Sequence, residues 1–316
     1  MERLKSRYAQ HKTWCDAVVT SPNPSAVKAG KIAAKVLSEI SGMVEPGVRI
    51  IKLCSTAERR IRELGGVPAF PFNVSINHIA AHSTSPRGDR SEVPEFGVVK
   101  LDIGVHIDGW IADTALTVDI DGTLEGLVAA PEDALNEAIA MFRPGVSLGE
   151  IGKVIERVIK DYGLRPISNL MGHSMKRNRL HAGRKVPNTK ARGYPIIEVG
   201  EYYAIEPYAT SGTGTVVDSE YVYIFGNTGL DEEIEGTTEK LRRYLRRQYG
   251  PFPFASRWIG TTNKQIDVVE ELRELLKARA IIGYPMQIEK KARPISQSEH
   301  TVFVTEEGPV VLTKRD

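Results

Sequence analysis

Two apolar, strand-like runs on either side of Asp108-Gly109 constrain the fold of this chain more than any other feature. The Asp-Gly dipeptide is a hairpin signal, because both residues tolerate the positive φ of a tight turn. Each run carries one aspartate, Asp102 or Asp113, although aspartate is depleted in strands and rarely buried without a partner. A hairpin that closes near Ile107 predicts that the two carboxylates lie directly opposite each other on one face of the sheet.

Two facing carboxylates repel, and their pKa values would be raised unless a cation lies between them. Three further candidates lie in or beside apolar runs, namely His173 in GHS, Glu206 in IEP and Glu299 in SEH. Each of the five could instead be structural, as a capping residue, a core histidine or a charge at a strand end. Together they form an oxygen-rich set that suits two divalent ions such as Mn, Fe or Co. Two such ions are typical equipment for amide hydrolysis.

The spacing of apolar residues predicts two helices followed by a sheet-rich part with further helices. Ser25 is the expected cap of the first helix. The expected elements are helices at residues 25–43, 54–65, 131–142 and 149–163, and strands at 73–79, 98–105, 111–120, 196–207, 215–225, 300–305 and 309–313. Residues 228–282 are charged and helix-forming, which predicts a helical insertion with helices at 236–249 and 264–281. The expected organisation is a polar lead-in at 1–24 and one domain at 25–316.

Composition excludes several classes of protein. A net charge of +2 argues against a dedicated nucleic-acid binder, which would carry a basic stripe. The two cysteines suggest no disulfide framework, and the charged N-terminus resembles neither a signal peptide nor an anchor. No segment approaches the roughly 18 apolar residues of a membrane span. We therefore expect a cytoplasmic protein without membrane contact.

The five candidates and their local phrases resemble the metal ligands of methionine aminopeptidases with the pita-bread fold. The phrases that match closely are LDIGVHIDGWIADTALTV, NLMGHSM, YAIEPYAT and SEHTVFV. Two others, FPFNVSINHIAAHSTS and LHAGRKVPN, resemble the segments that carry the family's two active-site histidines, here His82 and His181. The helical insertion followed by IIGYP is similar to the type II subfamily. Because a long charged N-terminal extension is missing, the archaeal form fits best.

This resemblance implies an α+β pita-bread fold, in which helices cover a curved, antiparallel-rich sheet. It also implies two divalent metal ions per chain, which could be Co, Mn, Fe or Zn. Asp102 would bind one ion and His173 with Glu206 the other, while Asp113 and Glu299 would bridge both. Glu206 is in addition the candidate proton shuttle.

The resemblance further implies how the substrate is held. His82 and His181 would contact it near the scissile peptide and help to stabilise the tetrahedral intermediate. Phe70, Leu180 and Tyr284 would form an apolar pocket for the methionine side chain. The implied partners are N-terminal Met peptides and nascent chains with a small second residue. A monomer without specific nucleic acid is expected, and transient contact with the ribosome is left open.

Two alternatives share this fold. One is a catalytically dead relative that binds RNA or ribosomes, but such proteins have lost metal ligands and all five are present here. The other is a prolidase or aminopeptidase P, which usually carries a large domain ahead of the catalytic one. Met171 and Leu180 depart from the residues usual at their positions in the type II enzymes, and both could alter the pocket.

Overall fold

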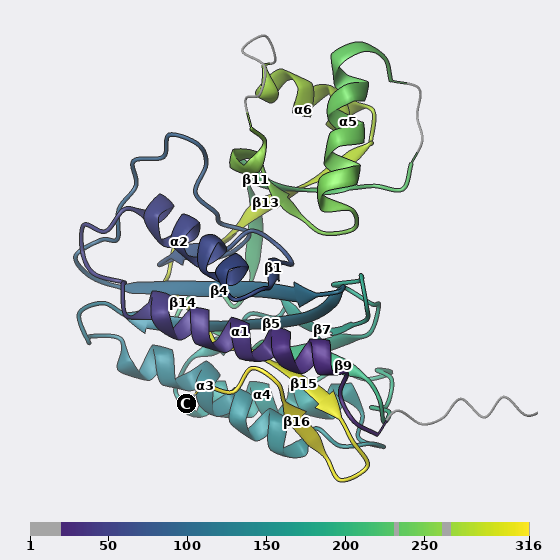
Figure 1. The fold of residues 1–316 in the computed structure, drawn as a ribbon. Coiled ribbons are helices and arrows are strands. Elements are labelled where there is room, and N and C mark those ends of the chain that lie inside the picture. The colour runs from purple at the N-terminus through teal and green to yellow at the C-terminus, as the bar shows by residue number, and fades with distance from the viewer. Residues whose placement is uncertain (1–19, 231–233, 261–266, 316) are drawn as a thin grey trace, which may run out of the picture.

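The structure is a computed structural model of the chain, and it describes residues 20–230, 234–260 and 267–315. Two pairs of helices cover antiparallel sheets, and a smaller helical unit stands at one end (Figure 1). The pairs are α1 (Pro24–Ser41) with α2 (Ile50–Glu63), and α3 (Glu125–Met141) with α4 (Leu148–Asp161). Most of the expected lead-in and parts of the expected insertion lie outside the described residues. Within the described ranges, no helix is long and apolar enough to cross a bilayer.

The first helix pair packs on a four-stranded sheet. Its strands are β1 (Val67–Pro68), β2 (Asn73–Ile76), β4 (Val98–Ile107) and β5 (Trp110–Asp119). Leu37 of α1 and Leu53 of α2 are fully buried in the core that the helices share with this sheet. The side chain of Asn23 accepts a hydrogen bond from the Ser25 backbone N–H (2.9 Å), and Pro24 is the first helical residue. Asn23 is therefore the cap, and the expectation of a Ser25 cap is wrong.

The β4–β5 hairpin has a different register from the expected one. Asp113 pairs with Gly104, two positions along β4 from Asp102, so the prediction that the two aspartates lie directly opposite each other is wrong. The turn is formed by Asp108 and Gly109, both with positive φ, one residue later than a closure at 107–108 would require. Because residues two apart on a strand share a face, both carboxylates still lie on the same face as diagonal neighbours.

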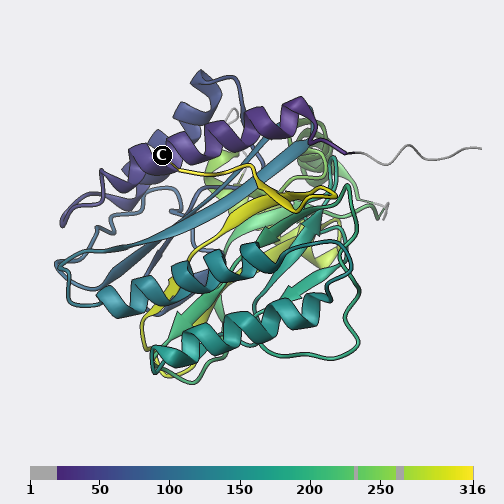
Figure 2. The same cartoon turned by 90° about the horizontal axis from the view of Figure 1, so that it is seen from below.

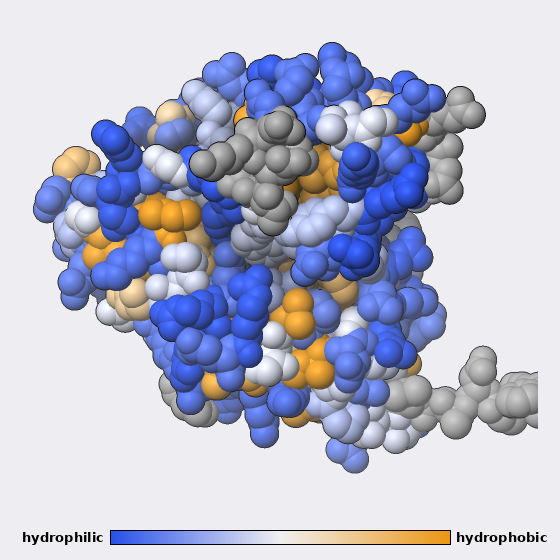
Figure 3. Space-filling view, turned by 45° about the horizontal axis from the view of Figure 1, so that its top comes forward, coloured by the Kyte–Doolittle hydropathy of each residue, from blue (hydrophilic) through white to orange (hydrophobic). Residues whose placement is uncertain are grey.

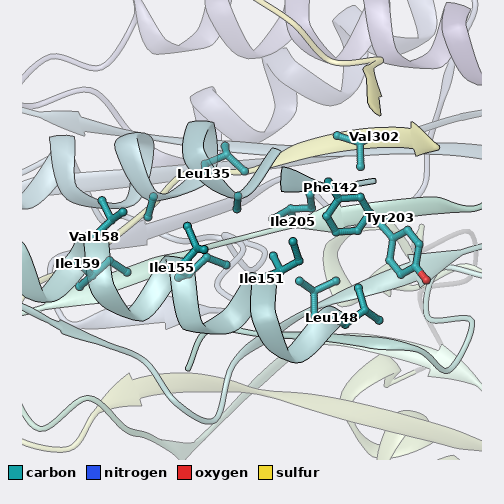
Figure 4. Close-up of a cluster of buried hydrophobic side chains, with 14 of the residues drawn as sticks. Leu135, Phe142, Leu148, Ile151, Ile155, Val158, Ile159, Tyr203, Ile205 and Val302 are labelled. Carbon is teal, nitrogen blue, oxygen red and sulfur yellow. The ribbon is translucent and has the colours of Figure 1, made fainter. Parts of the chain in front are cut away.

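The second helix pair lies over another antiparallel sheet (Figure 2). Its strands, in spatial order, are β16 (Pro309–Val311), β15 (His300–Val304), β9 (Tyr202–Ile205), β7 (Met171–Met175) and β8 (Lys185–Pro187). Tyr203, Ile205 and Val302 pack against the apolar faces of α3 and α4 (Figure 4). This packing holds β7, β9 and β15 in place, and three of the candidate ligands lie on or beside those strands.

Helix α3 begins at Glu125, ahead of the predicted start at residue 131. Pro131 lies inside the helix and has no N–H to donate to the carbonyl of Leu127, which disfavours a helix through this position. The Ser296 hydroxyl donates to that carbonyl instead (2.5 Å). A side chain distant in sequence thus satisfies the group that proline leaves free.

Two further sheets complete the fold. One consists of β6 (Arg165–Pro166), β10 (Tyr208–Thr210) and β14 (Ile295–Gln297). The other consists of β12 (Phe254–Ala255), β11 (Val216–Asn227), β13 (Ile281–Glu289) and β3 (Ile79–Ala81). In the second, the long β11–β13 pair joins the helical unit to the rest of the molecule (Figure 1).

The helical unit contains α5 (Gly236–Tyr249), the short 3-10 helix η1 (Ser256–Trp258) and α6 (Val268–Lys277). Leu245, Phe254 and Leu275 are fully buried in its own small core. Helix α5 has the predicted bounds, whereas α6 ends before residue 281 because Ile281 already pairs with Asn227 in the sheet. The domain boundaries at 228 and 282 remain a prediction. The face shown in Figure 3 is mostly hydrophilic, with small separate apolar patches.

Candidate metal centre

All ten predicted site residues line one pocket of about 390 Å³. The five candidate ligands come from three sheet strands and two strand ends. Asp102 lies on β4, Asp113 on β5 and His173 on β7, while Glu206 follows β9 and Glu299 precedes β15. An antiparallel bridge between Ala115 and Glu299 joins the two sheets at this point.

The distances among the candidate ligands are short. Nε2 of His173 lies 3.5 Å from Oδ2 of Asp113 and 3.8 Å from Oε1 of Glu206. Asp113, His173 and Glu299 each offer an atom within 4.8 Å of those of the other two. All three of these residues are buried, so their polar groups are largely removed from water.

The electrostatics of this cluster are unfavourable without a cation. Burial raises the pKa of Asp113 to about 8. Burial first, and then the neighbouring carboxylates, raise the pKa values of Asp102, Glu206 and Glu299 well above their ordinary range. Burial also lowers the pKa of His173 to about 4, so its imidazole is neutral and can act as a ligand.

Two observations indicate that a divalent ion fits here. Oδ1 of Asp102 is buried and has no hydrogen-bond partner among the described residues. The side-chain donors to the glutamates are neutral groups, the Tyr208 hydroxyl to Glu206 (2.9 Å) and the Gln297 amide to Glu299 (3.4 Å). Buried carboxylates with so little compensation are a typical cation-binding arrangement. Oxygen ligands with one imidazole suit Mn, Fe, Co or Zn.

Several supporting residues escaped the sequence analysis. Thr301 accepts a hydrogen bond from the Asp113 N–H and donates to its carbonyl, both at 2.7 Å. Thr114 donates to the Glu299 carbonyl (2.6 Å), and Asn188 donates to the Glu206 carbonyl (3.1 Å). These contacts fix the backbone that carries the ligands. A threonine or asparagine in an ordinary strand or loop gives no sequence signal for such a role.

His82 and His181 both border the cluster. Nδ1 of His82 donates to the Pro285 carbonyl (3.1 Å), and the residue has a positive φ of 59°. The ring of His181 is perpendicular to that of His173, with centroids 4.3 Å apart. Burial lowers the pKa of His82, and burial followed by the two other histidines lowers that of His181 to about 3. Both rings are therefore neutral at physiological pH.

An apolar wall lies beside the histidines. It includes Phe70, Leu180 and Tyr284, and the Tyr284 ring lies 5.6 Å from that of His82. Met171 also lines the pocket, and its sulfur accepts a hydrogen bond from the Tyr194 hydroxyl (3.7 Å). The site thus combines a polar cluster with a slot that could take an unbranched apolar side chain.

Comparison with known sequences identifies similar proteins along most of the chain. The model of metallopeptidase family M24 matches residues 26–237. A methionine aminopeptidase of Methanocaldococcus jannaschii is 43% identical over 288 residues, which cover 91% of this chain and 97% of that protein. One of Methanothermobacter thermautotrophicus is 43% identical over 293 residues, covering 92% and 98%.

Solved structures resemble the fold at lower identity. A thermophilic Arx1 superposes with a TM-score of 0.81 at 19% identity, covering 91% of this chain and 89% of the other. A methionine aminopeptidase from Thermotoga maritima superposes with a TM-score of 0.68 at 22% identity, covering 93% and 98%. At these identities the likeness concerns the fold alone.

Proposed function

The chain belongs to metallopeptidase family M24, among methionine aminopeptidases of the archaeal type, and from this premise we propose how its pocket releases an N-terminal methionine. The fold is the α+β pita-bread fold, and the protein is a metallo-aminopeptidase that removes the initiator methionine. The observation that carries the proposed mechanism is the convergence of four carboxylates and three imidazoles beside an apolar wall in one pocket.

We assign the metal ligands as follows. Asp102 would bind one divalent ion, His173 and Glu206 the other, and Asp113 and Glu299 both. Bound ions would supply Lewis-acid polarisation and lower the pKa of a water molecule. The neutral state of His173 and the unpaired oxygen of Asp102 support this assignment. The number of ions and their identity, whether Co, Mn, Fe or Zn, are part of the proposal.

The two histidines that flank the cluster would act on the scissile peptide. Because Nδ1 of neutral His82 donates to the Pro285 carbonyl, its Nε2 is an acceptor for the peptide N–H. His181 would donate to the carbonyl oxygen, where negative charge develops during hydrolysis. Glu206, oriented by the Tyr208 hydroxyl, would hold a proton and pass it from the attacking water to the leaving amine.

The pocket would also determine specificity. Phe70, Leu180 and Tyr284 offer apolar surface without a polar partner, as a thioether side chain requires. His82 and His181 would crowd the space beside the cluster, so the second residue should be small. The substrates would be N-terminal Met peptides and nascent chains. Action as a cytoplasmic monomer, with transient ribosome contact, belongs to the same proposal.

The alternatives are not favoured. A catalytically dead relative would lack ligands, and here all five border the pocket. The similarity to solved prolidases lies at 15% identity or less and concerns the fold alone. A panel of Met-Ala, X-Pro and Pro-X peptides separates the activities, and selective cleavage of Met-Ala is the expected result.

The ligand assignment is tested by metal content and turnover together. Purified protein is loaded with Mn, Fe, Co or Zn and assayed with Met-Ala-Ser. His173→Ala and Glu206→Ala should abolish turnover and lower the metal content without loss of the fold. Near-normal turnover by either variant at saturating metal would refute the role assigned to that residue.

A further inference from the structure

We propose that Arg257, in the helical unit, is a positioning residue that holds His82 in its active conformation. This inference rests on the proposed function, in which His82 contacts the scissile peptide. His82 has a φ of 59°, a left-handed conformation that is unfavourable for a residue with a Cβ. Such a conformation persists only where its surroundings over-determine it. The residues that follow His82 should therefore be firmly anchored.

The structure provides this anchor through Arg257. Its guanidinium donates to the Thr84 hydroxyl (2.7 Å) and to the Ser85 carbonyl (3.1 Å), both within three residues of His82. The same guanidinium forms an ion pair with Glu58 of α2. The side chains of Arg257 and Glu58 are only 7% and 6% exposed, so water does not compete for these contacts. The guanidinium makes these bonds from two nitrogens held apart in one plane, whereas a lysine would offer a single nitrogen without this fixed fork.

Further hydrogen bonds connect this anchor to the segment between β1 and β2, which carries Phe70 of the pocket wall. Thr84 donates to the Phe72 carbonyl (2.8 Å), and the Phe72 N–H donates to Glu58 (3.2 Å). The Trp258 indole N–H donates to the other oxygen of Glu58 (2.7 Å). The anchor therefore ties α2, the segment between β1 and β2 and the segment after His82 to one point of the helical unit.

His82 has a second fixed contact, with the strand that follows the helical unit. Pro285 of β13 accepts from Nδ1 of His82, and β13 is the strand that leads out of the unit. His82 is thus fixed between β13 and the Arg257 anchor. On this account the insertion contributes a rigid support for a catalytic histidine, and β13, which leads out of it, carries the wall residue Tyr284. Loss of the anchor should change the rate of the chemical step more than substrate affinity.

Two variants separate positioning from folding. Arg257→Lys keeps a cation beside Glu58 but loses the simultaneous contacts with Thr84 and Ser85. Thr84→Val leaves the buried ion pair intact and removes only the hydroxyl. Each should lower kcat for Met-Ala-Ser by about tenfold or more, because small displacements of a catalytic group reduce rates steeply. KM should change little. Thr84→Ser, which retains the hydroxyl, should restore kcat.

Arg62→Gln is the matched control. Arg62 stacks over Trp258 and donates to the Glu58 carbonyl, so it belongs to the same junction, but none of its observed contacts is with residues 82–85. Its kcat should stay close to that of the wild type. If Arg62→Gln lowered kcat as much as Thr84→Val does, loosening the junction alone would be sufficient to lower kcat. The proposal would then be wrong.

A double-mutant cycle with His82→Ala, measured under single-turnover conditions, tests whether Thr84 acts through His82. Thr84→Val should have almost no effect on the rate in the His82→Ala background.

In ¹⁵N-histidine NMR spectra of the protein, Arg257→Lys should shift the His82 Nδ1 signal. The proposal would be overturned if Thr84→Val lowered the rate equally in the wild-type and His82→Ala backgrounds. It would also be overturned if the His82 Nδ1 signal did not change in Arg257→Lys. Failure of the wild type to cleave Met-Ala-Ser would instead refute the proposed function.

Discussion

The ring of Phe70 lies so close to Gly104 that a Cβ on the glycine would stand 2.3 Å from Cε1 of the ring. Gly104 is also the residue that pairs with Asp113 across the hairpin. The glycine therefore allows the Phe70 ring of the pocket wall to pack directly on β4, the strand that also carries the candidate ligand Asp102. No larger residue fits at this position unless the ring moves.

Substitution of Gly104 should displace Phe70 into the pocket. We expect Gly104→Ala to raise KM for Met-Ala-Ser and to lower the free energy of unfolding by about 1–3 kcal/mol through overpacking. Steady-state kinetics and denaturant titration measure the two effects. Gly229→Ala is the control, because its new Cβ meets no atom within 4 Å. An unchanged KM in Gly104→Ala would show that Phe70 does not contact the substrate.

Tyr284→Ala should enlarge the apolar slot. We expect KM for Met peptides to rise by about tenfold, since an apolar contact contributes roughly 1–3 kcal/mol, and discrimination against leucine to weaken. In the wild type, norleucine-Ala-Ser should be cleaved more slowly than Met-Ala-Ser, and Leu-Ala-Ser and Met-Trp-Ser far less. Tyr221→Ala, on an exposed part of β11, should behave as the wild type. Efficient cleavage of the Leu or Trp peptide by the wild type would contradict the pocket assignment.

Removal of metal should expose the repulsion within the ligand cluster. Chelation should lower Tm, because an ion at a hundred times its Kd stabilises the folded state by about 2.7 kcal/mol. Asp102→Asn should raise Tm in the metal-free protein, since it removes one of four clustered carboxylates, and should lower Tm when metal is in excess. Thermal unfolding with and without chelator measures both changes. If Asp102→Asn changed Tm in the same direction with and without chelator, that result would argue against a cation at Asp102.

Glu289 should stabilise the fold in a pH-dependent way. Burial raises its pKa, but hydrogen bonds from the Thr213 hydroxyl and from the N–H groups of Thr213, Arg293 and Lys291 outweigh burial and lower it to about 2. A carboxyl group whose pKa is lower in the folded state stabilises the fold at pH values above its unfolded-state pKa. This stabilisation is lost as the pH falls toward the folded-state pKa.

The variant Glu289→Gln should therefore be less stable than the wild type by about 2–3 kcal/mol near pH 7. This difference should shrink as the pH falls from about 4.5 toward 2, because the wild-type carboxylate becomes protonated there. Denaturant titration of both proteins across this range measures the difference directly. A difference that is constant with pH would show that shape, and not charge, accounts for it.

The sequence by itself determined the features that depend on short stretches of chain. The apolar runs around Asp108-Gly109 specified the hairpin, and acids in apolar contexts marked Asp102, Asp113 and Glu206 as unusual. These signals are local, because turn preference, amphipathic spacing and the misplacement of a charge are all visible within a few residues.

Only the tertiary structure decided the features that depend on distant partners. The Ser296 hydroxyl allows α3 to continue through Pro131, which local propensity argues against. Glu58 and Arg257 meet across 199 positions of sequence, and neither carries a local sign of the other. A buried polar group must be paired wherever a partner becomes available, and the packing of helices on sheets, not the sequence order, determines which partner that is.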